Sequence, residues 1–304
     1  MQNKESLLYA VMLSELPQVG ERIASAILAR SAERGHGLAS FFRLPAAVLR
    51  RDYSLPLAAL RCLEHHAEAH RRRCEWLSAN LHESGGWACT LLDPDYPRRL
   101  RHRADAPPVL FFFGDPTCAA QPTIAPLHSR TPTEGTVGCI RAVVEAAARA
   151  GFAVVTSTGK AAYRLVGVTA RALSVPRLVV LDRGLFSALG VELRADPFAY
   201  RGAAHPCAPT EHGQLVCSPF RLLDHALPRS GRRRDALVAA LADVIFALHA
   251  RPGGEIERLC LAALEQGQPV LSWHGENPAL LSAGAIPISG DDLRHLHRFV
   301  PISR

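Results

Sequence analysis

The stretch "GTVGCIRAVVEAAARAGFAVVTSTGKAAYRL", residues 135–165, contains the patterns of a helix, a buried strand, a short turn and a second helix. Val137, Ile140 and Val143 recur at helical spacing, and Gly151 can end that helix in the left-handed conformation. The following "FAVVT" has the length and composition of a buried strand. A strand flanked by two helices of this length is typical of a βαβ unit, which places neighbouring strands parallel.

Short apolar segments of the same kind lie on both sides of this stretch. They are "ACTLLD", "VLFFF", "RLVVLD", "DVIFAL" and "QPVLSW", and helical stretches separate most of them. Before residue 84 the patterns are helical throughout. The sequence therefore predicts an α/β fold with a Rossmann-like, doubly wound, mostly parallel sheet over residues 85–304, and a small all-α domain over residues 1–84.

The helical region contains one candidate DNA-binding element. "LPQVGERIASAIL", residues 16–28, resembles half of a helix-hairpin-helix, whose glycine turn presents backbone amides to a phosphate. Gly20 supplies one glycine, but Glu21 and Arg22 follow where the second is usual. A DNA-binding module related to the SAM-like helical domains and a purely structural helical hairpin both remain open.

The composition favours a soluble protein with a polyanionic partner. The 304 residues are 48% hydrophobic and 21% charged, and the formal net charge is +7. Only Lys4 and Lys160 are lysines, and arginines form runs at 71–73, 98–103 and 232–234. Nucleic acid is one partner that such runs fit, and a solvated arginine surface is the alternative.

The sequence gives no sign of a membrane, a secretory leader or a metal. The longest apolar run, Ala236–Ala250, is too short to span a bilayer and contains Asp243. No leader precedes the first helix, so we expect a cytoplasmic protein. The eight cysteines are dispersed, without a CxxC pair or clustered histidines, which predicts packing thiols and no metal site.

Ligands of doubly wound sheets bind beyond the carboxyl ends of the strands, which here points to residues 128–135, 156–163 and 249–257. The second of these loops has a single Gly159-Lys160 pair and lacks the upstream glycine and the metal-binding hydroxyl of a magnesium ATPase loop. The helix start "SGRRRDAL" offers Ser230 as an N-cap and then places three arginines at the positive end of a helix. Either an anion docks there or the arginines extend into solvent.

The segment "LLDPDYPRRLRHRADAPPVLFFFGD", residues 91–115, has Asp-x-x-Tyr-Pro followed by Pro-Pro-x-Leu-Phe-x-x-Gly. This pattern resembles the entry to the Rossmann-like domain of the DNA-processing protein A (DprA, or Smf) family. "SRTPTEG", "VVTSTGKAAY", "RRRDALVAALADVIFAL", "PGGEIERLC" and "GENPALLSAGAIPI" then resemble later family motifs in the same order.

The resemblance implies a protein without catalytic residues or cofactor, which binds single-stranded DNA, forms a homodimer and helps to load a RecA-type recombinase during natural transformation. The positions that it implies as phosphate contacts lie in the three loops and at the helix start. They are Ser129, Arg130, Lys160, Arg232, Arg233, Arg234, Gly253 and Gly254.

Departures from the family pattern leave two alternatives. In the second loop the family's Arg, Gly and Asp are Lys160, Ala161 and Tyr163, and its Arg-Asn-Arg motif keeps only Arg234 in register. One alternative is nucleotide binding or sensing without catalysis, as in LOG-type relatives, since "PGGEIERLC" keeps their Pro-Gly-Gly but not their Gly-Thr and carboxylate. The other is a non-binding interaction subunit. The segment 186–227 receives no role.

Overall fold

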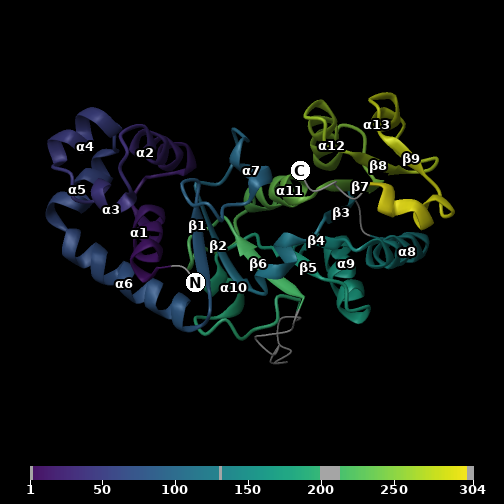
Figure 1. The fold of residues 1–304 in the computed structure, drawn as a ribbon, viewed down its shortest axis with the longest axis horizontal. Coiled ribbons are helices and arrows are strands. Elements are labelled where there is room, and N and C mark those ends of the chain that lie inside the picture. Colours follow the sequence, from purple (N-terminus) through teal and green to yellow (C-terminus); the bar gives the residue numbers. More distant parts are fainter. Residues whose placement is uncertain (1–2, 130–131, 199–212, 300–304) are drawn as a thin grey trace. The chain divides into compact units, whose positions relative to one another are not determined.

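The computed structural model describes residues 3–129, 132–198 and 213–299 (Figure 1). The chain divides into two compact units. The first unit comprises residues 1–113, 183–193 and 218–224, and the second comprises 114–182, 194–217 and 225–304. The boundary after residue 84 that the sequence predicts remains a prediction, because compactness groups the next segment of chain with the N-terminal helices.

The first unit is mainly helical. Its N-terminal helices are α1 (Lys4–Glu15), α2 (Glu21–Glu33), α3 (Leu38–Phe41), α4 (Ala46–Tyr53), α5 (Leu57–His65) and α6 (Ala67–Glu83). The strand β1 (Trp87–Thr90) pairs antiparallel with β2 (Val109–Gly114), and the short helices α7 (Arg98–Arg101) and α10 (Leu185–Leu189) complete the unit.

The link between α1 and α2 is the half helix-hairpin-helix of the sequence. Gly20 caps α2 with extended backbone, and Gln18 takes the left-handed conformation, with φ 57°. Leu7, Val11 and Leu13 of α1 are buried. The segment is therefore a packed helical hairpin whose left-handed residue is not its glycine.

The second unit is built on parallel strands. They are β3 (Thr123–His128), β4 (Ala153–Ser157), β5 (Arg177–Val180), β6 (Gln214–Ser218), β7 (Val244–His249), β8 (Val270–Trp273) and β9 (Ile286–Ile288). Their order is β6-β5-β4-β3-β7-β8-β9, and every neighbouring pair among these described strands is parallel. The chain winds outward from β3 to β6 and then returns to the other side of β3. This is the doubly wound α/β sheet that the sequence predicts.

Helices cover both faces of this sheet (Figure 1). One face carries α8 (Glu134–Ala150), α9 (Ala161–Ala172) and the 3-10 helix η2 (Asp292–Phe299). The other carries α11 (Ser230–Leu241) and α12 (Glu255–Glu265), and α13 (Pro278–Ser282) packs against α12. The remaining helix is η1 (Pro116–Ala120), a 3-10 turn before β3. Because both faces are covered, β3 and β4 are buried along their whole length.

Most local signals in residues 135–165 act as predicted, but Val137, which has the helical spacing of Ile140 and Val143, is 43% exposed. Thr133 caps α8, and Gly151 ends it in the left-handed conformation, with φ 75°. Ile140 and Val143 pack into the same core as Val154 of β4. Ser230, in contrast, does not cap α11: it is the first helical residue, Arg229 is the N-cap, and the Ser230 hydroxyl accepts a hydrogen bond from Leu227 N.

Two further features are the state of the cysteines and the hydropathy of the helices. The seven described cysteines are free, and burial raises the pKa of Cys217 and Cys260 to about 12, so both are packing groups rather than nucleophiles. Within the described ranges, no helix has the length and apolar character needed to cross a membrane.

Candidate nucleic-acid interface

The carboxyl ends of β3, β4 and β7 lie at one edge of the sheet, because these strands are parallel neighbours. Ser129 follows β3 and joins the first and third predicted loops. Its N–H donates to His249 O at 2.9 Å, and its hydroxyl accepts from Arg251 N at 3.0 Å. Ser129 therefore fixes the backbone of the third loop beside its own. Arg130, the neighbouring predicted contact, lies outside the described residues.

Lys160 is the N-cap of α9, at the end of the second predicted loop. Its Nζ lies 2.6 Å from Asp235 Oδ2 and 5.6 Å from the centre of the Tyr163 ring. The lysine side chain is 33% exposed, whereas that of Asp235 is 3% exposed. Lys160 is thus held by an internal carboxylate and keeps part of its surface open to solvent.

Arg234 lies beneath the same loop and is closed off from solvent, with a side chain 4% exposed. Its Nε and Nη2 each donate to Asp235 Oδ1 at 3.0 Å, and its Nη1 lies 3.4 Å from Asp182 Oδ2. The guanidinium also lies over the Tyr163 ring, at 5.3 Å from its centre. A methyl group at Gly159 would overlap Arg234 Nη1, so the glycine of the Gly-Lys pair gives room to this arginine.

The ring of Tyr163 contacts both cations, Lys160 and Arg234. Its side chain is fully buried, and burial, with the nearby Asp235 carboxylate as the next cause, raises the pKa of the phenol well above its usual value. Cation–π contacts of this kind stabilise by about 0.5–2 kcal/mol. The residue that replaces the family's Asp is thus the aromatic surface on which Lys160 and Arg234 rest.

The other two arginines of the run reach different surroundings. The Arg232 side chain is 80% exposed, and its Nε lies 3.8 Å from Glu255 Oε2. Arg233 is partly buried, and desolvation lowers the pKa of its guanidinium to about 10, which leaves it protonated at neutral pH. Of the three, only Arg232 projects into solvent.

The Pro-Gly-Gly turn also closes on a carboxylate of the chain. Gly253 is left-handed, with φ 66°, and its N–H donates to Glu257 Oε2 at 2.7 Å. Gly254 caps α12 and donates to Arg251 O at 2.9 Å. Glu257 is buried in the first turn of α12, where a negative charge is stabilised by the helix dipole. The amide that a bound anion would use here is occupied.

Sequence reasoning missed two residues of this edge. Arg251 is exposed in the third loop, with its N–H on Ser129. Asn277 is buried and left-handed, and its side chain joins Ala250 N, Ala247 O and the Ser272 hydroxyl, so it ties the ends of β7 and β8 together. The Asn-Pro pair at the start of α13 was the available signal for a special backbone position.

The described side chains at this edge do not form a metal-binding site. His249 Nδ1 lies 2.9 Å from Glu276 Oε2, and the His128 and His249 rings are 5.4 Å apart. Across the part of the chain that the structure describes, no three His, Cys, Asp or Glu side chains come together as a metal site requires.

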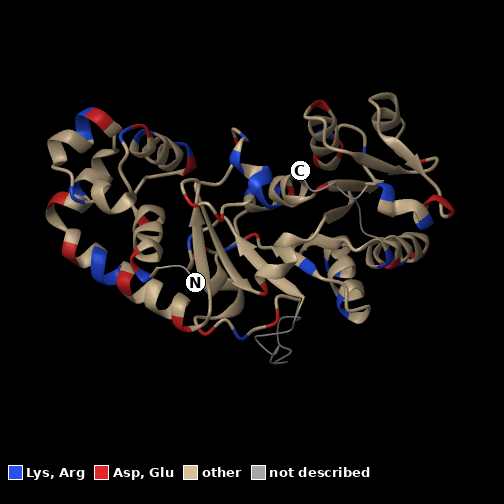
Figure 2. Cartoon of the chain, viewed as in Figure 1, with Lys and Arg blue, Asp and Glu red and all other residues tan. Residues whose placement is uncertain are grey.

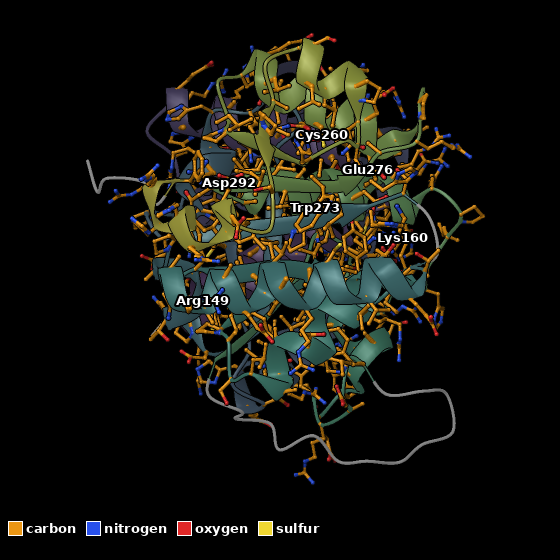
Figure 3. The ribbon with its side chains drawn as sticks, turned by 90° about the vertical axis from the view of Figure 1, so that its right-hand side faces the viewer. Arg149, Lys160, Cys260, Trp273, Glu276 and Asp292 are labelled. Carbon is orange, nitrogen blue, oxygen red and sulfur yellow. The ribbon has the colours of Figure 1, made fainter. Side chains whose placement is uncertain are left out.

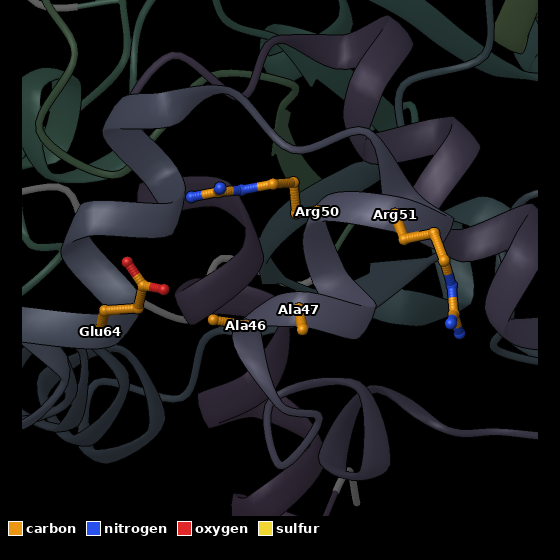
Figure 4. Close-up of a pocket in the computed structure, with 5 residues that line it drawn as sticks. All are labelled: Ala46, Ala47, Arg50, Arg51 and Glu64. Atoms are coloured by element: carbon orange, nitrogen blue, oxygen red, sulfur yellow. The ribbon is translucent and has the colours of Figure 1, made fainter.

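A pocket lies on the first unit, at α4 and α5 (Figure 4). It is lined by Ala46, Ala47, Arg50, Arg51 and Glu64. Arg51 is already paired, with its Nε 2.7 Å from Asp52 Oδ1. None of these residues belongs to a predicted loop or to the carboxyl edge of the sheet, so the pocket is not part of the interface.

Comparison with known proteins identifies one matching family model and solved structures of similar fold. The model of the family "DNA recombination-mediator protein A" matches residues 87–287. DNA processing protein A from Streptococcus pneumoniae is similar in structure, with a TM-score of 0.70, 17% identity and 100% of both chains covered.

The protein of the same name from Helicobacter pylori, whose structure is described as showing a single-stranded DNA binding mode, has a TM-score of 0.53 and 19% identity. That comparison covers 69% of this chain and 94% of the other. Among curated protein sequences, none matches this chain.

Proposed function

The chain belongs to the DNA recombination-mediator protein A family, and from that premise we propose that it binds single-stranded DNA at the carboxyl edge of the parallel strands of the second unit. The family is one of recombination mediators rather than enzymes, as the sequence predicts. The observation that carries the proposal is the extent of the family match, which begins at β1 and ends within β9, so that all the loops of this edge lie inside it.

The exposed cations of this edge are the phosphate contacts. Lys160 offers its open surface beside the second loop, Arg232 projects from α11, and Arg251 is exposed in the third loop. Cations at strand ends hold a DNA backbone without reading its sequence, because they meet phosphates and not base edges. Arg234 is a positioning residue in this scheme, since it is buried and supports Gly159 and Tyr163 from below.

We extend the proposal to two finer activities that membership of the family supports. The chain forms a homodimer and delivers single-stranded DNA to a RecA-type recombinase, in the setting of natural transformation. Sedimentation velocity tests the dimer, and strand exchange by a recombinase on coated DNA, with and without this protein, tests the delivery. A monomer at micromolar concentration would reject the homodimer. Strand exchange that this protein leaves unchanged would reject the delivery of DNA to the recombinase.

The binding itself is tested by fluorescence anisotropy with an oligothymidylate over a range of salt concentrations. Each phosphate that is neutralised contributes about 0.7 to the slope of log K against log salt for a single strand. Replacing Lys160 and Arg232 together by alanine is expected to lower that slope. Absence of binding by the wild-type protein at low salt rejects the proposal.

Arg149→Ala is the matched control for this experiment. Arg149 is exposed in the last turn of α8, and Figure 3 shows it and Lys160 at opposite ends of that helix. Because α8 runs antiparallel to the strands that it connects, Arg149 lies at their amino edge. The control removes one positive charge from the same layer of the fold, as Lys160→Ala alone does, so comparing these two variants separates a contact at the carboxyl edge from a general effect of net charge.

A further inference from the structure

The second and third loops share a feature that the family resemblance does not explain. In each, groups expected to meet a phosphate are bound by a buried carboxylate from the first two turns of a helix. Asp235 of α11 holds Lys160 and Arg234, and Glu257 of α12 holds the N–H of Gly253. The two carboxylates lie on different helices and accept hydrogen bonds from different donors, so the two observations are independent.

Asp235 is used at both oxygens. Oδ2 accepts from Lys160 Nζ at 2.6 Å, and Oδ1 accepts from Arg234 Nε and Nη2, each at 3.0 Å. An ionised carboxylate only accepts hydrogen bonds, as a phosphate does, and it meets an arginine fork with the same geometry. The carboxylate therefore makes the contacts that a phosphate oxygen would make with these two cations.

The charges of this group also cancel. Lys160 and Arg234 contribute two positive charges, and the buried Asp182 and Asp235 contribute two negative ones. A polyanion that approaches the loop therefore meets no net charge from these four residues. Its attraction comes from cations at the rim, such as Arg232.

We propose that Asp235 and Glu257 are internal anions that occupy the second and third loops in place of DNA phosphates, and that they thereby limit the affinity of this chain for single-stranded DNA. The proposal deepens the proposed function and rests on it. Removing either negative charge releases donors that the chain now binds itself, and each release adds a phosphate contact.

The test is the salt dependence of oligothymidylate binding by the full-length Asp235→Asn variant. Asparagine has the shape of aspartate and still accepts from Arg234, but it leaves Lys160 without an ionic partner. One added contact is expected to raise the slope by about 0.7 and the affinity about fivefold at 0.1 M salt. Adding Lys160→Ala to Asp235→Asn is expected to abolish the gain.

Asp196→Asn is the matched control. Asp196 is a carboxylate of the same unit that is paired in the same way, with its two oxygens each 2.8 Å from a terminal nitrogen of Arg171 in the last turn of α9. It changes the net charge by the same amount at the opposite end of α9 from Lys160. Binding by this control that matches the wild type, together with a steeper slope for Asp235→Asn, supports the internal anion.

The outcomes distinguish a failure of the internal-anion proposal from a failure of the proposed function. If the wild type binds and Asp235→Asn shows no steeper slope than Asp196→Asn, the internal anion is overturned and the proposed function stands. If Asp235→Asn binds where the wild type does not, the internal anion is supported and the proposed function fails. If neither binds, both fail. Should Asp235→Asn not fold, Glu257→Ala tests the third loop, because alanine leaves the Gly253 N–H free for a phosphate. An affinity at 0.1 M salt no higher than that of Asp196→Asn then overturns the proposal.

Discussion

Two runs of three arginines differ in how far their side chains are exposed to solvent. Arg71, Arg72 and Arg73 on α6 are all half-exposed or more, and each is paired with a glutamate. On α11, Arg232 is exposed, whereas Arg234 is almost completely buried between two carboxylates. Figure 2 shows basic and acidic residues interspersed along α6. Successive helical residues point about 100° apart, so a run of three samples three environments, and the core decides which of them is covered.

The largest expected effect on stability comes from replacing Arg234, the buried arginine of the second run. Arg234→Ala leaves Asp182 and Asp235 without their buried partner and opens space beneath Gly159. Breaking a buried pair by removing one member costs about 3–5 kcal/mol. We expect a loss of that order in the free energy of unfolding, measured by urea denaturation. A loss below about 1 kcal/mol would contradict the placement of Arg234 as a structural anchor.

The second effect tests how tightly Arg234 is enclosed. A methyl group at Gly159 overlaps the arginine head, and overpacking of this kind costs about 1–3 kcal/mol. We expect Gly159→Ala to lower the midpoint of thermal unfolding. Gly138→Ala is the control: Gly138 lies within α8 with no atom within 4 Å of the added methyl, so helix propensity should raise stability by about 0.5–1 kcal/mol. Equal effects of the two changes would refute the enclosure.

A third effect concerns Glu15 of α1, whose buried side chain pairs with Arg73 of α6. Burial raises the pKa of Glu15, and the charges of Arg221 and Arg73 oppose that shift. The folded protein therefore binds a proton more tightly than the unfolded chain, so this group's contribution to stability falls as the pH rises from its ordinary pKa through the raised one. Glu15→Gln should remove that fall, because glutamine is never ionised. Unfolding free energies from pH 4 to pH 7 check this, and a variant whose pH profile matches the wild type would refute it.

The contrast also shows what the sequence could indicate about the site. Arg234 shares one helical face with Leu237, Val238 and Leu241, at spacings of three, four and seven residues, and that pattern indicates an inward position. The pattern does not reveal the partners, because Asp182 is 52 residues from Arg234 along the chain, and Lys160 is 75 residues from Asp235. Only the folded sheet brings the end of β4 beside α11.

The fold was predictable where local signals agree. Six strands follow the apolar segments, and β3, β6 and β9 were missed. β3 contains Pro126, which normally argues against a central strand. Its register with β4 ends at Ile124, whereas Pro126 stays opposite Phe246 of β7, so the proline lies where the ladder to β4 has already stopped. β6 lies in the segment that received no role, and β9 has only three residues.

The smallest expected effect on stability comes from the exposed pair of Arg72 and Glu68 on α6. Arg72 Nη1 is 3.4 Å from Glu68 Oε1 one helical turn earlier, with both side chains about 70% exposed. Glutamate four residues before a cation is the favourable orientation, but water and salt screen such pairs to about 0.3–0.5 kcal/mol. A double-mutant cycle of Glu68→Ala and Arg72→Ala should give a coupling of that size, which 1 M salt reduces. A coupling above about 1 kcal/mol would show that exposure does not separate the two arginine runs, because a solvated pair would then approach the energy of the buried one.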